Sequence, residues 1–147
     1  MMDKRIDQIN RSYVRFLNAV GSESITNYFN LPLELNVTVT RISSDIFMVL
    51  VVYENKPPLI SQFNLPLELH DYIKSFLHKK YIINTQVRYP EQYPWRSPIW
   101  THVSSTTNPI SPKQLVRFNA EMTESWLPCS ILEHDILYYL VWLVDIL

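Results

Sequence analysis

The order of secondary-structure patterns along the chain predicts an α+β fold built on an antiparallel sheet. A helical pattern comes first, strand-like stretches follow, and a long helical pattern closes the sequence. This succession differs from the regular alternation of strands and helices that parallel βαβ units need. A length of 147 residues suits one domain, 1–147, with a real hydrophobic core.

The first helix is predicted by apolar residues that recur every three or four positions from Ile6 to Val20. We expect it to end at Gly21, the only glycine of the chain. Its other face is basic, which is typical either of a solvated flank or of a partner-binding patch. The candidate partner-binding residues there are Lys4, Arg5, Arg11 and Arg15.

Two strands follow. Apolar and polar residues alternate over 35–41, and 46–53 is a continuous apolar, β-branched run. The short polar link Ser43-Ser44-Asp45 predicts that they form an antiparallel hairpin. Strand-like patterns recur at 81–89 and 99–103, with prolines on both sides of the last one. The four stretches together predict a four-stranded antiparallel meander.

The segment 54–80 separates the second and third strands and contains a helical pattern from Leu69 to Leu77. It also holds a second copy of the heptapeptide Phe-Asn-Leu-Pro-Leu-Glu-Leu, at 63–69, which first occurs at 29–35. The flanks of the two copies differ, and the first copy leads into a strand while the second leads into a helix. We therefore interpret them as two similar approach segments or as chance, and not as a repeat architecture.

The C-terminal helix, predicted over 131–147, is apolar almost all round from Ile136 onward. It is too short to span a bilayer, which needs about 20 apolar residues. Its second face must be buried within this domain, or against another chain or a membrane surface. The candidate partner-binding residues on this helix are Tyr138, Val141 and Trp142.

Composition excludes several classes of function. A net charge of -1 provides no field that would concentrate nucleic acid, and a single glycine excludes the glycine-rich phosphate loops. One cysteine excludes an internal disulfide and fits a reducing, intracellular compartment, and the N-terminus lacks the apolar core of a signal peptide. No metal or cofactor site is expected, because His70 and His78 are too far apart for a zinc-binding pair.

The stretch 89–100, with an aromatic-Pro pair followed by Tyr-Pro-Trp-Arg-Ser-Pro, resembles the signature of the ubiquitin-conjugating enzyme (UBC) family. A Trp-x-Pro element at 126–128 is similar to a second landmark of that family. The residues that carry the resemblance are Tyr89, Pro90, Tyr93, Pro94, Pro98, Trp126 and Pro128. The resemblance implies a UBC-like fold in which 54–80 is a helical insertion.

The same resemblance implies that the chain is not an enzyme. Counting between the two landmarks places the family's His-Pro-Asn on Asn108-Pro109-Ile110 and its catalytic cysteine on Phe118. The nucleophile and the asparagine that steadies the oxyanion would then both be absent.

We therefore expect a non-catalytic interaction module, most simply a structural subunit of a larger protein complex that binds other subunits through the C-terminal helix and 54–80. An alternative is an enzyme variant that assists an active conjugating enzyme, with that enzyme or ubiquitin as its partner. A second alternative is an active enzyme that uses Cys129, which would lie in the first turn of a helix. His134 and Asp135 would lie off the face of Cys129, so a catalytic triad is not supported.

Overall fold

The computed structural model describes residues 4–55, 66–77, 79–103, 109–128 and 131–147. Five helices and four strands are found in these ranges. In chain order they are α1 (Lys4–Val20), α2 (Ile25–Phe29), β1 (Leu35–Arg41), β2 (Ile46–Asn55), α3 (Leu67–Leu77), β3 (Lys79–Arg88), β4 (Ile99–His102), α4 (Pro112–Ser125) and α5 (Leu132–Ile146).

The α+β class is confirmed, as is the four-stranded antiparallel meander, whose strand order is β1-β2-β3-β4. The first helix ends as expected at Gly21, which has a φ of 59° and whose N–H donates to the carbonyl of Leu17. A residue without Cβ adopts this left-handed conformation without steric cost. The predicted turn between β1 and β2 is also present.

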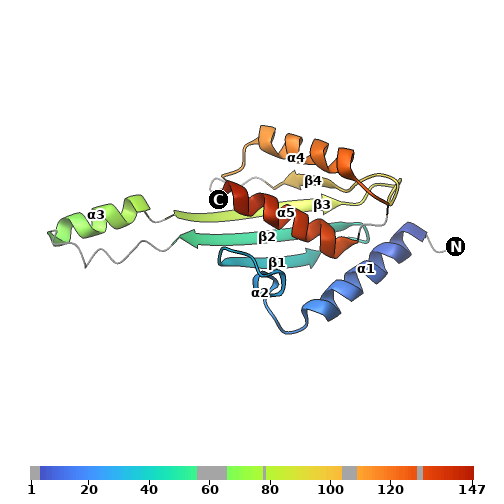
Figure 1. The fold of residues 1–147 in the computed structure, drawn as a ribbon, viewed down its shortest axis with the longest axis horizontal. Helices are drawn as coiled ribbons and strands as arrows, with labels where there is room; N and C mark the ends of the chain where they lie inside the picture. The colour runs from blue at the N-terminus through green and yellow to red at the C-terminus, as the bar shows by residue number, and fades with distance from the viewer. Residues whose placement is uncertain (1–3, 56–65, 78, 104–108, 129–130) are drawn as a thin grey trace.

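The helices α1, α4 and α5 pack on one face of the sheet, and α5 lies across its middle (Figure 1). Alternate residues of the central strands, such as Val49, Val51 and Ile83, point toward α5 and are fully buried. From α5 the core receives Tyr139 and Leu140, which are also fully buried. The opposite face of the sheet is not covered by a helix in the described ranges.

Two helices, α2 and α4, were not predicted. Helix α4 has a strong local start signal, because Ser111 and Gln114 form a reciprocal capping box and Pro112 occupies the first turn. Its buried residues Leu115, Phe118 and Met122 follow helical spacing. The resemblance implies a catalytic segment between its two landmarks and does not predict this helix.

The second face of α5 is covered in part by α4. The ring centroid of Trp142 lies 4.6 Å from that of Phe118, while Tyr138 and Val141 remain half-exposed. Packing within the domain thus buries part of the second apolar face of this helix. No helix in the described ranges is long and apolar enough to cross a membrane.

Helix α3 projects beyond the end of β2 and β3, away from the other helices (Figure 1). Its described apolar side chains Leu67, Leu69 and Tyr72 are exposed. This helix therefore contributes little to the core through those residues.

Candidate protein-binding groove

The connection from β3 to β4, residues 89–98, begins at a buried tyrosine that is held from three directions. The N–H of Tyr89 donates to the carbonyl of Asp45 (2.8 Å), and its own carbonyl accepts from the Arg5 guanidinium (2.8 Å). Its hydroxyl donates to the Asp135 carboxylate of α5 (2.6 Å). Side chains from α1 and α5 therefore fix the start of this connection.

The middle of the connection is fixed by Tyr93, which is buried and packs edge-on against Tyr89 with ring centroids 4.7 Å apart. Trp126 packs on Tyr93, and its indole N–H donates to the carbonyl of Pro94 (2.7 Å). The Tyr93–Pro94 peptide bond is cis. The two tyrosines and Trp126 are thus the residues that attach the connection to the core.

The end of the connection is attached to α4. The Ser97 hydroxyl lies 3.1 Å from the Thr123 hydroxyl. The side-chain amide of Asn119, in α4, accepts a hydrogen bond from the backbone N–H of Trp100 in β4 (2.9 Å) and donates one to the carbonyl of the same residue (2.8 Å). Asn119 therefore occupies the free edge of the sheet at this residue, which prevents another strand from pairing there.

Burial governs the ionisation of the groups below this connection. It raises the pKa of Asp135 to about 7, although the hydrogen bond from Tyr89 lowers it. Burial is also the main reason why the pKa of Tyr89 is raised well above its usual value, and it raises the pKa of Tyr93 to about 12. These groups stabilise the position of the connection, and all three are buried away from solvent.

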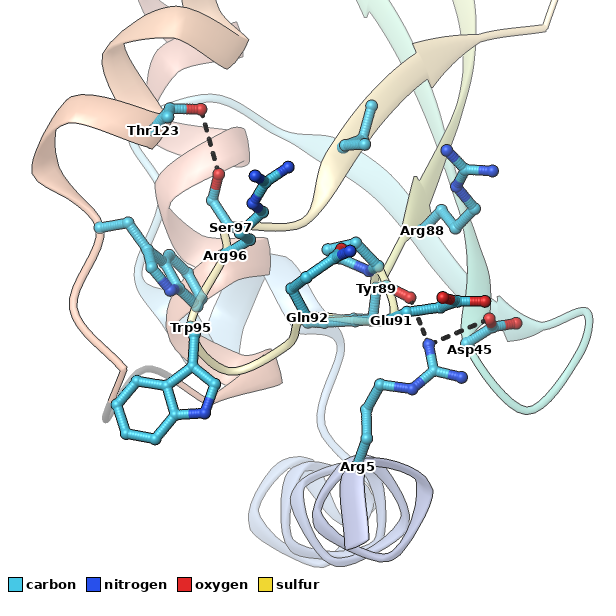
Figure 2. Close-up of a pocket in the computed structure, with 13 residues that line it drawn as sticks. Arg5, Asp45, Arg88, Tyr89, Glu91, Gln92, Trp95, Arg96, Ser97 and Thr123 are labelled. Atoms are coloured by element: carbon cyan, nitrogen blue, oxygen red, sulfur yellow. Dashed lines mark hydrogen bonds and ion pairs between the residues drawn. The ribbon is translucent and has the colours of Figure 1, made fainter. Parts of the chain in front are cut away.

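The connection borders a groove of about 860 Å³. Trp95, at the tip of the connection, is 77% exposed, and Arg88 and Arg96 are also exposed. Figure 2 shows these side chains extending from a backbone that is attached on both sides, with Arg5 and Asp45 at one end of the groove. The arrangement presents an indole and two guanidinium groups from a fixed backbone.

The predicted partner-binding residues do not come together in this groove. Lys4, Arg11 and Arg15 are exposed on α1, with Arg11 paired to Asp7 (2.6 Å). Arg5 lines the groove, but its guanidinium is occupied by Asp45 and by the Tyr89 carbonyl. The residues of α5, Tyr138, Val141 and Trp142, lie outside the groove.

The sequence predicts that prolines make this connection rigid and that Tyr93 and Trp95 both pack it onto the core. The structure confirms this for Tyr93, whereas the predicted inward position of Trp95 is wrong, because its side chain is 77% exposed. Tyr93 and Trp126 already fill the inward positions. Arg88 and Arg96 are not among the predicted site residues.

Only some of the positions considered for catalysis lie within the residues that the structure describes. Phe118 is fully buried in α4, and Ile110 is buried in the same hydrophobic core. Asp135 is engaged by Tyr89, and His134 is exposed. Cys129 and Asn108 lie outside the described residues. In the described part of the chain, no three His, Cys, Asp or Glu side chains are grouped so that they could hold a metal ion.

No protein-family model, curated protein or solved structure matches the chain. The function must therefore be inferred from the groove and from the resemblance carried by 89–100 and 126–128.

Proposed function

We propose that this protein is a non-catalytic interaction module with a UBC-like fold, and that it serves as a structural subunit of a larger protein complex. In this proposal, α3 belongs to an insertion, 54–80, at a place where the family has a short turn. The observation that carries the proposal is the exposure of Trp95 at the tip of a connection whose backbone is attached to the core on both sides.

Exposed tryptophan and arginine side chains are the residue types that most often dominate the energy of protein interfaces. A backbone held by Tyr89, Tyr93 and Trp126 loses little conformational entropy when a partner binds. Trp95 shares the groove with a second apolar side chain, Ile99, which is 38% exposed. A single exposed aromatic would need no explanation, whereas this grouping supports an interface.

The environment of position 118 supports the absence of catalysis. A catalytic cysteine must reach a substrate carbonyl from a partly exposed site. Position 118 lies on the buried face of α4, where Phe118 packs against Trp100 and Trp142. A nucleophile placed there would have no access to a substrate.

The test is the native size of the protein in a lysate of its own source, combined with a photocrosslinking amino acid introduced at Trp95. We expect a large assembly and crosslinks to one defined partner. The matched control is the same crosslinker at Val116, which is exposed on α4 and does not line this groove.

Trp95→Ala should release the protein from the assembly, whereas Val116→Ala should not. Migration as a free monomer would contradict the proposal. Co-migration with a conjugating enzyme would instead favour an enzyme variant that assists an active partner. A reductant-sensitive thioester to ubiquitin that is lost in Cys129→Ala would show that the protein is an active enzyme.

A further inference from the structure

The charges around the groove are not all balanced within the molecule. Arg5 pairs with Asp45 at 3.3 Å and donates to a backbone carbonyl, so that its charge is used internally. The guanidinium groups of Arg88 and Arg96 make no hydrogen bond or ion pair with other residues in the described ranges. Three arginines, Arg5, Arg88 and Arg96, and two carboxylates, Asp45 and Glu91, line the groove. The lining is therefore positive by one charge.

Both free arginines extend from well-defined backbone. Arg88 is the last residue of β3, and it is paired with Ile46 of β2 on one side and with Ile99 of β4 on the other. Arg96 follows Trp95 in a turn closed by a hydrogen bond from its N–H to the carbonyl of Gln92 (3.2 Å). The positions of the two arginines relative to Trp95 are thus largely set before a partner arrives.

We infer that this groove binds an acidic segment of a partner protein. Carboxylate side chains of the segment pair with Arg88 and Arg96, and a neighbouring apolar side chain packs on Trp95. Guanidinium groups favour carboxylates because their forked donors match the two carboxylate oxygens. This inference rests on the proposed function and adds the chemistry of the partner to it.

The size and shape of the groove fit a peptide segment. About 860 Å³ of space is open to solvent and runs along the connection from Arg88 to Ile99. Nucleic acid is less favourable, because the chain as a whole has a net charge of -1 and cannot offer an extended row of phosphate contacts.

The experiment is a selection of phage-displayed random peptides of about twelve residues against the full chain, carried out at low and at physiological salt. The wild-type protein should enrich sequences in which Asp or Glu lies next to a large apolar residue. A synthetic peptide of the most enriched sequence is then used to measure affinity by fluorescence anisotropy.

The double variant Arg88→Ser/Arg96→Ser should weaken binding of this peptide by roughly tenfold and remove most of its salt dependence. Trp95→Ala should weaken it by a similar factor. The control is Arg117→Ser, an exposed arginine of α4 outside the groove, which should bind like the wild type. Unfolding midpoints of all variants establish that each one is folded.

The inference is overturned if the enriched peptides are neutral or basic, if no peptide is enriched, or if the double arginine variant binds the acidic peptide as tightly as the wild type. Preferential binding of single-stranded RNA at the same arginines would also overturn it. If the native assembly depends on Trp95 while acidic peptides fail to bind, this inference falls and the proposed function stands. If acidic peptides bind but no assembly exists, the proposed function falls instead.

Discussion

The last three residues of the two Phe-Asn-Leu-Pro-Leu-Glu-Leu heptapeptides adopt different structures. In the first copy, Leu33-Glu34-Leu35 approaches and enters strand β1, where Leu35 is only 6% exposed. In the second copy, Leu67-Glu68-Leu69 forms the first turn of helix α3, where Leu67 is 80% exposed and Leu69, the counterpart of Leu35, is 43% exposed. The local sequence is identical, so the difference comes from the surroundings of each copy.

The first copy is held by tertiary contacts. Leu35 pairs with Tyr53 of β2, and its carbonyl accepts a hydrogen bond from the Thr26 hydroxyl. The second copy has local contacts instead, since the N–H groups of Leu69 and His70 donate to the carbonyl of Pro66. Leucine and glutamate favour helices intrinsically, and burial in a sheet outweighs that preference where a sheet is within reach.

The same contrast recurs for single residues of one type. Asp135 is buried and Asp145 is exposed, although both belong to α5. Trp126 is half-buried against Tyr93, whereas Trp95 is mostly exposed. Each pair allows a test in which the amino acid is constant and only its surroundings change.

The largest change in the free energy of unfolding is expected for Asp135, the buried aspartate of α5. Burial raises the pKa of Asp135 from 3.8 to about 7. The folded state therefore binds this proton more tightly than the unfolded chain, so that the contribution of this carboxyl is greatest below pH 3.8 and is lost as the pH rises to about 7. The loss amounts to at most ~4 kcal/mol over that range.

The measurement is the free energy of unfolding in urea at about pH 4 and about pH 8 for the wild type and for Asp135→Asn. The stability of the wild type relative to Asp135→Asn should fall between the two pH values. If that difference is the same at the two pH values, the Asp135 carboxyl is not held in a buried site.

The next largest difference in the free energy of unfolding is expected between leucine substitutions in the two heptapeptides. Leu35→Ala removes a buried side chain and should lower the free energy of unfolding by about 3 kcal/mol. Leu67→Ala, in the second copy, should change it by no more than about 0.5 kcal/mol. Urea unfolding of both variants checks this, and equal losses would show that α3 is packed as firmly as β1.

Of the tryptophans, Trp126→Ala should cost about 2 kcal/mol, below the usual range for a fully buried aromatic because Trp126 is half-buried. Part of that cost is the hydrogen bond from its indole to Pro94. Trp95→Ala should leave the thermal midpoint nearly unchanged while it weakens binding to the partner enough to release the protein from the assembly. A large loss of stability in Trp95→Ala would argue that its ring is part of the core.

The smallest effect concerns the hydrogen bond that holds the first heptapeptide. Thr26→Val keeps the shape of the side chain but removes the donor to the Leu35 carbonyl, and it should cost about 1 kcal/mol. The control is Thr38→Val, on the exposed side of β1. Chemical denaturation distinguishes the two variants, and a loss confined to Thr38→Val would contradict this account of β1.

The candidate site was predicted only in part. The resemblance drew attention to Tyr89, Tyr93 and Trp126, and these residues attach the connection to the core. The prediction that Trp95 also packs on the core is wrong, since its side chain is exposed, and the two arginines of the groove were not predicted. It treated Arg5 as a surface residue, whereas its guanidinium reaches Asp45 and the Tyr89 carbonyl, which are distant in sequence.

By itself, the sequence determined the elements whose residues repeat with a helical or strand period, because amphipathic patterns are local and each needs only one apolar face to be buried. The N-terminal helix, the hairpin of β1 and β2, and the C-terminal helix belong to this group. Tertiary structure alone decided that α4 covers part of α5, that the end of one heptapeptide enters a strand while the end of the other begins a helix, and that Trp95 points outward. These outcomes depend on which surfaces meet after the chain has folded, and residues distant in sequence supply those surfaces.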